Sequence, residues 1–379
     1  MSFDGGASGE KRVGFLELFF DLVFVFAVTQ IVGLLHDDHS VAGWGRAGLM
    51  LWFVWWAWSQ YTWTGNSVDL DRRLSRLVVL AAMGAILIAA TAIPSAYEQD
   101  GWWFALPYAA VRLVSLVLYW FGVRHDRTYR AALATYIPIA AAAPLLVAIG
   151  AIAEGDARIG LWFAALLVDV GSVVAAGRGE FRVDPAHFAE RHGLFVIIAL
   201  GESVIAIGAT ASDVGLDGDV LLVVGLAYAV VAALWWGYFD WVNAAAEARL
   251  AGEPDHRRRS NLARDLFTLG HLPIIAGTVT FAAGIEEALL HPSAPMESFA
   301  AVAVTVGPAM YLVGFLLGNL RATGRVLPAR TAGVAAVIAI GAIAGTRADA
   351  SVTIGLIAAV AAAIGASETF LRSRTPLEA

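Results

Sequence analysis

Twelve apolar runs of about 20 residues, separated by short charged connections, dominate this 379-residue chain. A helix of that length spans the ~30 Å hydrocarbon core of a bilayer. Hydrophobic residues make up 59% of the sequence and charged residues only 15%, whereas a soluble domain has about 25% charged residues. The sequence therefore predicts an all-α integral membrane protein whose first partner is the lipid bilayer.

The expected helices follow from the apolar runs. They lie near 13–35, 43–65, 77–97, 102–123, 131–153, 159–177, 192–211, 219–245, 262–284, 298–320, 328–346 and 350–371. The N-terminus lacks the short apolar core and cleavage site of a signal peptide, so we expect the first span to be retained.

The charges of the connections predict the orientation of the chain. With twelve spans, 21 of the 25 basic residues fall on one side, among them Lys11 and Arg191, while Arg46, Arg158 and Arg347 fall on the other. Cytoplasmic loops of membrane proteins carry the excess of lysine and arginine. We therefore expect a multi-pass protein of the inner membrane with both termini in the cytoplasm.

An internal repeat divides the predicted chain into halves. Three segment pairs recur in the same order about 180 residues apart, namely 19–29 with 200–210, 55–63 with 235–243, and 72–77 with 257–262. The first pair aligns Asp21 with Glu202. Six spans per half is an even number, so the two halves share one orientation. We predict parallel six-helix repeats at 1–180 and 192–379, joined by a cytoplasmic loop at 181–191.

Ionisable residues inside the spans are the candidate functional groups. Those placed near the middle of the membrane are Asp21, Arg112, Asp169, Glu202 and His271, and those nearer the cytoplasmic surface are Glu17 and Asp240. A charge at the helix centre costs roughly 2.5–3.5 kcal/mol on insertion scales, so each needs a partner, a cavity or water.

Two interpretations of these groups stay open. Arg112 can serve as a fixed counter-charge that neutralises one acid and sets the helix register. Alternatively, three midplane carboxylates against one arginine leave two to be balanced by a proton, a metal cation or His271, as in proton relays and cation pathways. Glu17 and Asp21 are four residues apart and share one helix face, which suits a path leading inward.

Other chemistry has little support in the sequence. The chain has no cysteine, and we find no phosphate loop, no zinc-protease motif and no nucleophile elbow. We therefore expect no cofactor and no nucleic-acid partner. His36 and His39 bracket two aspartates in an outer loop, and this pattern by itself favours a solvated loop over a divalent-ion site. Metal binding and the oligomeric state stay open.

Four segments together resemble one known family. They are ELFFDLVFVFAV (17–28), ERHGLFVIIALGESVIAIGA (190–209), LWWGYFDW (234–241) and GHLPIIAG (270–277). They look like the motifs of the bacterial low temperature requirement protein A family, which comprises polytopic membrane proteins named from a cold-growth phenotype. The resemblance implies a membrane protein and leaves its mechanism open.

The segment FFDLVFVFAVT (19–29) is also similar to the FSD signature of the lysosomal potassium channel family and its bacterial relatives. There, an aspartate near the start of the first helix opens a six-span repeat. Phe20 stands here where that signature has serine, and the second half has Glu202 preceded by Leu200 and Gly201. These departures count against carrying over a potassium selectivity role.

Three functions are compatible with the sequence. The first is a transporter or ion-conducting protein in which Asp21 and Glu202 bind an ion or a proton with help from His271. The second is a membrane-embedded enzyme that acts on lipid or a small molecule through the same acids. The third is a stress-tolerance protein whose buried charges only hold the bundle together.

Overall fold

A computed structural model describes residues 12–70 and 72–374 of the chain. Within these ranges the secondary structure is helical, with no β-strand. Lys11, which we counted among the cytoplasmic charges, lies outside the described residues.

The helices run in order as α1 (Phe15–Asp37), α2 (Val41–Gly65), α3 (Arg73–Thr91), α4 (Trp102–Val123), α5 (Arg127–Gly150), α6 (Gly155–Ala176), α7 (Pro185–Val214), α8 (Gly218–Gly237), the π-helix η1 (Tyr238–Val242), α9 (Asn243–Ala251), α10 (His256–Ala263), the π-helix η2 (Arg264–Leu269), α11 (His271–Leu290), α12 (Ser298–Thr323), α13 (Pro328–Ala344) and α14 (Ala350–Arg374). Because α8 continues through η1 into α9, and α10 through η2 into α11, the described residues form twelve continuous helical segments. The predicted all-α membrane fold with twelve helices is confirmed.

Ten of these segments are long and apolar enough to cross a membrane. The other two differ for separate reasons. Helix α13 is a shorter apolar helix of 17 residues. Helix α2 has 25 residues but a less apolar composition, and most of its side chains are buried against other helices instead of facing lipid.

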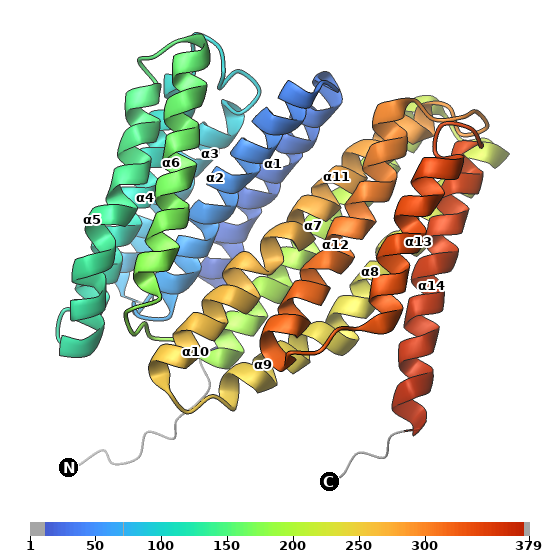
Figure 1. The fold of residues 1–379 in the computed structure, drawn as a ribbon. Helices are drawn as coiled ribbons and strands as arrows, with labels where there is room; N and C mark the ends of the chain where they lie inside the picture. The colour runs from blue at the N-terminus through green and yellow to red at the C-terminus, as the bar shows by residue number, and fades with distance from the viewer. Residues whose placement is uncertain (1–11, 71, 375–379) are drawn as a thin grey trace.

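The helices form two groups that meet along α1, α2, α7 and α11 (Figure 1). In the first group α1 packs on α2 and α3, and successive helices from α3 to α6 pack on one another. In the second group α7 packs on α8 and α11, and α11, α12, α13 and α14 pack in succession. This repeated pattern of neighbours is what a duplication would produce. The duplication and the two-half division stay predictions.

Two helices of the second group, α11 and α12, approach so closely that glycine is required at their contact. A Cβ atom added at Gly277 would lie 2.4 Å from the Gly307 carbonyl oxygen, and one added at Gly307 would lie 2.7 Å from the Gly277 carbonyl oxygen. Small residues allow this packing in membranes, where apolar surface gives helices no preference for each other over lipid. The contact fixes the core of the second group.

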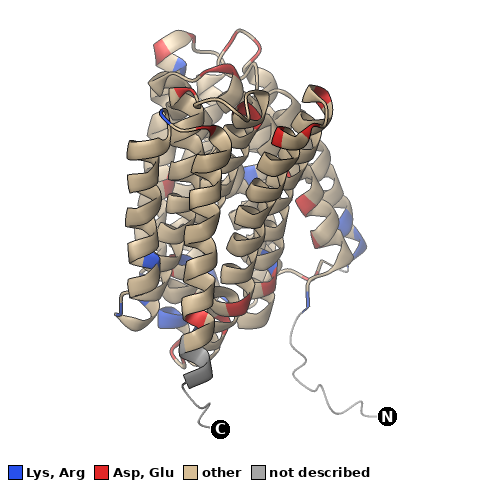
Figure 2. Ribbon diagram, turned by 90° about the vertical axis from the view of Figure 1, so that its right-hand side faces the viewer, with Lys and Arg blue, Asp and Glu red and all other residues tan. Residues whose placement is uncertain are grey.

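The ends of the bundle differ in charge (Figure 2). Acidic positions gather at the upper end, and most basic positions lie toward the end where α14 finishes. Helix α1 begins at that same basic end (Figure 1). We refer below to the basic end and the acidic end of the bundle.

Candidate functional site

Two ionisable pairs join α1 to α7 near the basic end. His187 Nε2 lies 3.0 Å from Glu17 Oε1. One turn further along both helices, Arg191 Nη1 donates to Asp21 Oδ2 at 2.7 Å. All four side chains are buried. Glu17 and Asp21 thus share one face, as their spacing predicted, and both have partners on α7.

Trp58 of α2 completes the environment of Asp21. Its indole Nε1 donates to Asp21 Oδ1 at 2.8 Å, and its ring lies 5.4 Å from the Arg191 guanidinium carbon in a cation–π arrangement. Asp21 lies six residues, or about 9 Å, after the start of α1. It is therefore closer to the basic end than the midplane position we expected.

The buried Arg191 corrects the charge count made from the sequence. We expected residues 181–191 to form a cytoplasmic loop, but α7 begins at Pro185. The Asp184 side chain accepts from the His187 backbone N–H at 3.1 Å, and proline follows at the first helical position. Both features are typical of a helix start. Arg191 is therefore a buried helical arginine that pairs with Asp21, and the count of three carboxylates against one arginine left it out.

Arg112 pairs with Asp169 inside the first group of helices. Its Nη2 donates to Asp169 Oδ1 at 2.8 Å and its Nη1 to Oδ2 at 3.1 Å. Nη1 also donates to the Tyr108 hydroxyl at 2.6 Å, and Nε donates to the Gln60 side-chain oxygen. Both charged side chains have 0% exposure. The forked geometry satisfies both groups and ties α4 to α6.

Glu202 differs from the other buried acids. It lies 17 residues after the start of α7 and 12 before its end, with 2% exposure. The Thr29 hydroxyl of α1 donates to Glu202 Oε2 at 2.8 Å. Among the described residues, no lysine, arginine or histidine forms an ion pair with it.

His271 lies where the two π-helices come together. Its Nε2 is 2.7 Å from the hydroxyl of Tyr238, the first residue of η1, and its Nδ1 is 3.0 Å from the Leu266 carbonyl oxygen in η2. A carbonyl only accepts, so Nδ1 carries the proton and neutral His271 accepts from Tyr238 at Nε2. Short π-helices within α-helices occur often at functional sites.

His192 connects His271 to the α1–α7 pairs. The rings of the two histidines are 5.0 Å apart. His192 Nδ1 lies 2.8 Å from the Phe188 carbonyl oxygen, so it donates there. His192 Nε2 is then left with an acceptor lone pair.

Three buried nitrogens of α7 have no hydrogen-bond partner among the described residues: His187 Nδ1, Arg191 Nε and His192 Nε2. Buried polar groups are normally satisfied, and water does this where protein does not. Their grouping on two turns of one helix leaves unused hydrogen-bonding groups beside the α1–α7 pairs.

Asp240, the remaining predicted site residue of the second half, is exposed, unlike Glu202 and His271. It lies in η1, two residues after Tyr238. Of the predicted site residues, Glu17, Asp21, Glu202 and His271 thus lie along the α1–α7–α11 interface. Asp169 and Arg112 form a separate pair.

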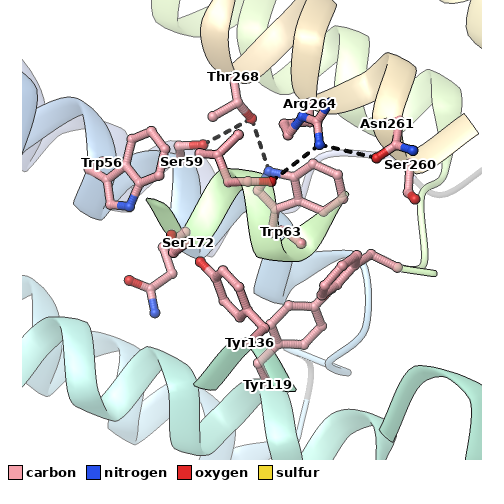
Figure 3. A pocket seen from close by; sticks show the side chains of 14 residues that line it. Trp56, Ser59, Trp63, Tyr119, Tyr136, Ser172, Ser260, Asn261, Arg264 and Thr268 are labelled. Atoms are coloured by element: carbon pink, nitrogen blue, oxygen red, sulfur yellow. Dashed lines mark hydrogen bonds between the residues drawn. The ribbon is translucent and has the colours of Figure 1, made fainter. Parts of the chain in front are cut away.

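A cavity of about 60 Å³ lies between the two helix groups (Figure 3). On one side, Ser59 and Trp63 of α2 bond the Thr268 hydroxyl at 3.2 and 3.0 Å. Next to them, Arg264 Nη1 donates to the Asn261 side-chain oxygen at 3.1 Å, and Tyr119 and Tyr136 lie across the cavity. The volume holds a few water molecules but no lipid-sized substrate.

A larger cavity of about 230 Å³ lies inside the second group. His271 lines it, together with residues of η1, α9, α11, α12 and α14, and three charged side chains, Arg249, Arg330 and Glu368, also border it. Arg330 Nε donates to Glu368 Oε1 at 2.6 Å, which ties α13 to α14. His271 is therefore in contact both with Tyr238 and with a space large enough for a small molecule.

The family model of the bacterial low temperature requirement A protein (LtrA) matches residues 12–366. The chain belongs to the bacterial low temperature requirement A family. The LtrA match runs from α1 into α14 and includes the pairs Glu17–His187, Asp21–Arg191 and Arg112–Asp169. The resemblance drawn from the four sequence motifs is confirmed.

One LtrA-like relative is an uncharacterized protein of Rhizobium meliloti (strain 1021). It is 32% identical over 333 residues, which cover 84% of this chain and 80% of the relative. No solved structure matches the chain. The similarity to the potassium channel family stays a prediction.

The sequence reasoning missed several members of the interface. His187 and Arg191 were assigned to a loop, although their spacing of four residues matches that of Glu17 and Asp21, and Asp184 with Pro185 gives a helix-start signal. Thr29, Tyr238 and His192 have no comparable sequence signal, because their roles depend on which helices become neighbours.

Proposed function

We propose that the protein moves protons or small cations across the membrane along the α1–α7–α11 interface, with Glu202 as the ion-binding group. One observation carries this proposal: Glu202 is buried midway along α7 and forms no ion pair within the described part of the chain. A buried carboxylate that has no cationic partner and lies near a second carboxylate, Glu286 of α11, must be protonated or hold a cation.

Thr29 allows Glu202 to exist in both forms. Its hydroxyl lies 2.8 Å from Glu202 Oε2 and 3.2 Å from the Val25 carbonyl oxygen. When Glu202 is ionised, Thr29 donates to the carboxylate. When Glu202 is protonated, the carboxyl O–H donates to Thr29 Oγ1, and Thr29 turns its own proton to Val25. The hydrogen bond between Thr29 and Glu202 is therefore kept in both states.

The partnerless nitrogens of α7 support a hydrated route from the basic end. His187 Nδ1 and His192 Nε2 each present a ring nitrogen that can hydrogen-bond to water. Water that satisfies these atoms would connect them to one another and to the Glu17–His187 pair at the start of the helix. We propose that ions enter by this route and reach Glu202 further along α7.

The other intramembrane acids have structural roles in this proposal. Asp21 and Asp169 each have a guanidinium partner at 2.7–2.8 Å. A carboxylate held in this way is already neutralised, so it is poorly suited to exchanging an ion. These pairs fix the neighbours of α1 and α4 instead.

Flux into liposomes tests the proposal. Purified protein is reconstituted at matched density, and H⁺, K⁺ and Na⁺ fluxes are measured under imposed gradients. We expect flux of at least one ion above that of empty liposomes, and its loss in Glu202→Gln. Asp213→Asn, an exposed acid on the same helix, is the matched control and should keep the flux. Absence of flux for all three ions, or unchanged flux in Glu202→Gln, would overturn the proposal.

The 230 Å³ cavity beside His271 supports a second candidate, an enzyme or binding protein acting on lipid or a small molecule. Pockets of this kind combine an apolar lining with a few polar groups. A product that accumulates with wild-type protein and disappears in His271→Ala, with ion flux absent from both, would favour this function over transport.

A further inference from the structure

We propose that His36, His39 and Glu287 bind a divalent transition-metal ion of the zinc class at the acidic end of the bundle. The three residues come from the last turn of α1, the link to α2 and the end of α11. One ligand atom of each lies within 4.8 Å of those of the other two. Residues 251 positions apart in the sequence therefore meet at one point.

The separation of the ligand atoms is close to that of a metal site. His36 Nδ1 lies 3.7 Å from Glu287 Oε2, while two ligands of a tetrahedral zinc with bonds of about 2.0–2.1 Å are roughly 3.4 Å apart. Glu286 Oε2 lies 4.0 Å from the same nitrogen. Small side-chain rotations would close the three ligands around an ion and bring a second carboxylate within reach.

Packing holds the ligands in place. The His39 ring stacks on Phe299 of α12, with centroids 3.8 Å apart and planes 3° from parallel. The next residue, Ser40, caps α2 by accepting from the Gly43 backbone N–H at 3.1 Å, so the short link is tied at both ends. His36 is 43% exposed and Glu287 is 16% exposed. An ion therefore reaches a largely prearranged site directly from solvent.

The donor set identifies the class of ion. Two imidazoles and one carboxylate suit zinc and its transition-metal neighbours, whereas Ca²⁺ and Mg²⁺ prefer oxygen ligands throughout. Three protein ligands leave a fourth position for water or for Glu286. The HDDH loop by itself favoured no metal, and Glu287 supplies the ligand that the loop lacks.

Zinc titration of the purified full chain in detergent, without a histidine tag, tests this inference. A chromophoric chelator competes for the metal and reports the stoichiometry. We expect one zinc per wild-type chain and an affinity at least tenfold weaker in His36→Ala and in Glu287→Gln. His291→Ala removes another exposed histidine after α11, and it should bind as wild type does. Mg²⁺ should not compete.

Thermal unfolding gives a second readout, because a metal that binds the folded protein stabilises it by mass action. Zinc should raise the midpoint of the wild type and of His291→Ala, and raise it less in the two ligand variants. No zinc binding by the wild type, or equal binding by all variants, would overturn the site. Binding in detergent requires no ion movement, so this outcome is independent of the flux measurements.

Discussion

Replacing Arg112 by glutamine removes the guanidinium that neutralises Asp169 at a fully buried position. Two hydrogen bonds of 2.8 and 3.1 Å join the pair, and hydrogen bonds to charged groups contribute about 1.5–3 kcal/mol each. Removing one partner of a buried pair costs about 3–5 kcal/mol, because the other charge stays behind. We expect Arg112→Gln and Asp169→Asn each to lower the free energy of unfolding by this amount.

The double variant Arg112→Gln/Asp169→Asn separates the attraction between the two charges from the cost of burying each charge. With both charges removed, no uncompensated ion stays buried, so the loss should be smaller than the sum of the two single losses by at least about 2 kcal/mol. The exposed pair Arg46–Asp38, separated by 3.5 Å in the same helix group, is the matched control. Its removal should change stability by no more than about 1 kcal/mol.

Equilibrium unfolding in mixed micelles, followed by tryptophan fluorescence as the fraction of denaturing detergent rises, gives these free energies. Near-zero coupling between Arg112 and Asp169, or single losses no larger than those of the exposed pair, would refute the assignment of this pair as a fixed structural link.

Three further predictions use the same preparations. Arg191→Gln leaves the buried Asp21 carboxylate without its counter-charge and should lower the free energy of unfolding by about 3–5 kcal/mol in the same assay. A loss below about 1 kcal/mol would contradict that pairing. Gly277→Ala places a Cβ atom against the backbone of α12 and should lower the free energy of unfolding by about 1–3 kcal/mol. The control Gly208→Ala, whose added Cβ meets nothing within 4 Å, should leave it unchanged. Equal effects of the two variants would contradict the close contact between α11 and α12. Because the chain has no cysteine, Asp217→Cys should react with an impermeant maleimide from outside intact cells, and Arg258→Cys only after permeabilisation. Labelling of both positions from one side would contradict the predicted alternation of the spans, and the opposite labelling pattern would place the termini outside the cytoplasm.

The transmembrane helices were predictable because the signal for each is local. A run of about 20 apolar residues cannot satisfy its backbone in lipid except as a helix. The alternation of basic and acidic connections between the apolar runs then supports the number of predicted helices. Even α2, which is not among the ten helices long and apolar enough to cross a membrane, was identified from its length between charged connections, although its tryptophans pack inside the bundle.

Only part of the site could be predicted. The position of an acid along its helix follows from that helix alone, whereas its partner depends on which second helix packs beside it. Glu17, Asp21 and Glu202 stood out as acids within apolar runs. The partner of each acid depends on which helix lies beside it, so the partner of Arg112 was left open. Arg191 was missed for a different reason: α7 is 30 residues long, and its first turns, rich in charge, resemble a loop in composition.

Infrared difference spectroscopy of the carboxyl C=O stretch tests the central claim, that Glu202 exchanges an ion from a buried position. Purified wild type and Glu202→Gln are titrated from acid to alkaline pH under the same conditions. The account predicts a band of a buried protonated carboxyl that appears on acidification of the wild type and is missing from the variant. The same band, with the same pH dependence in both proteins, would contradict it.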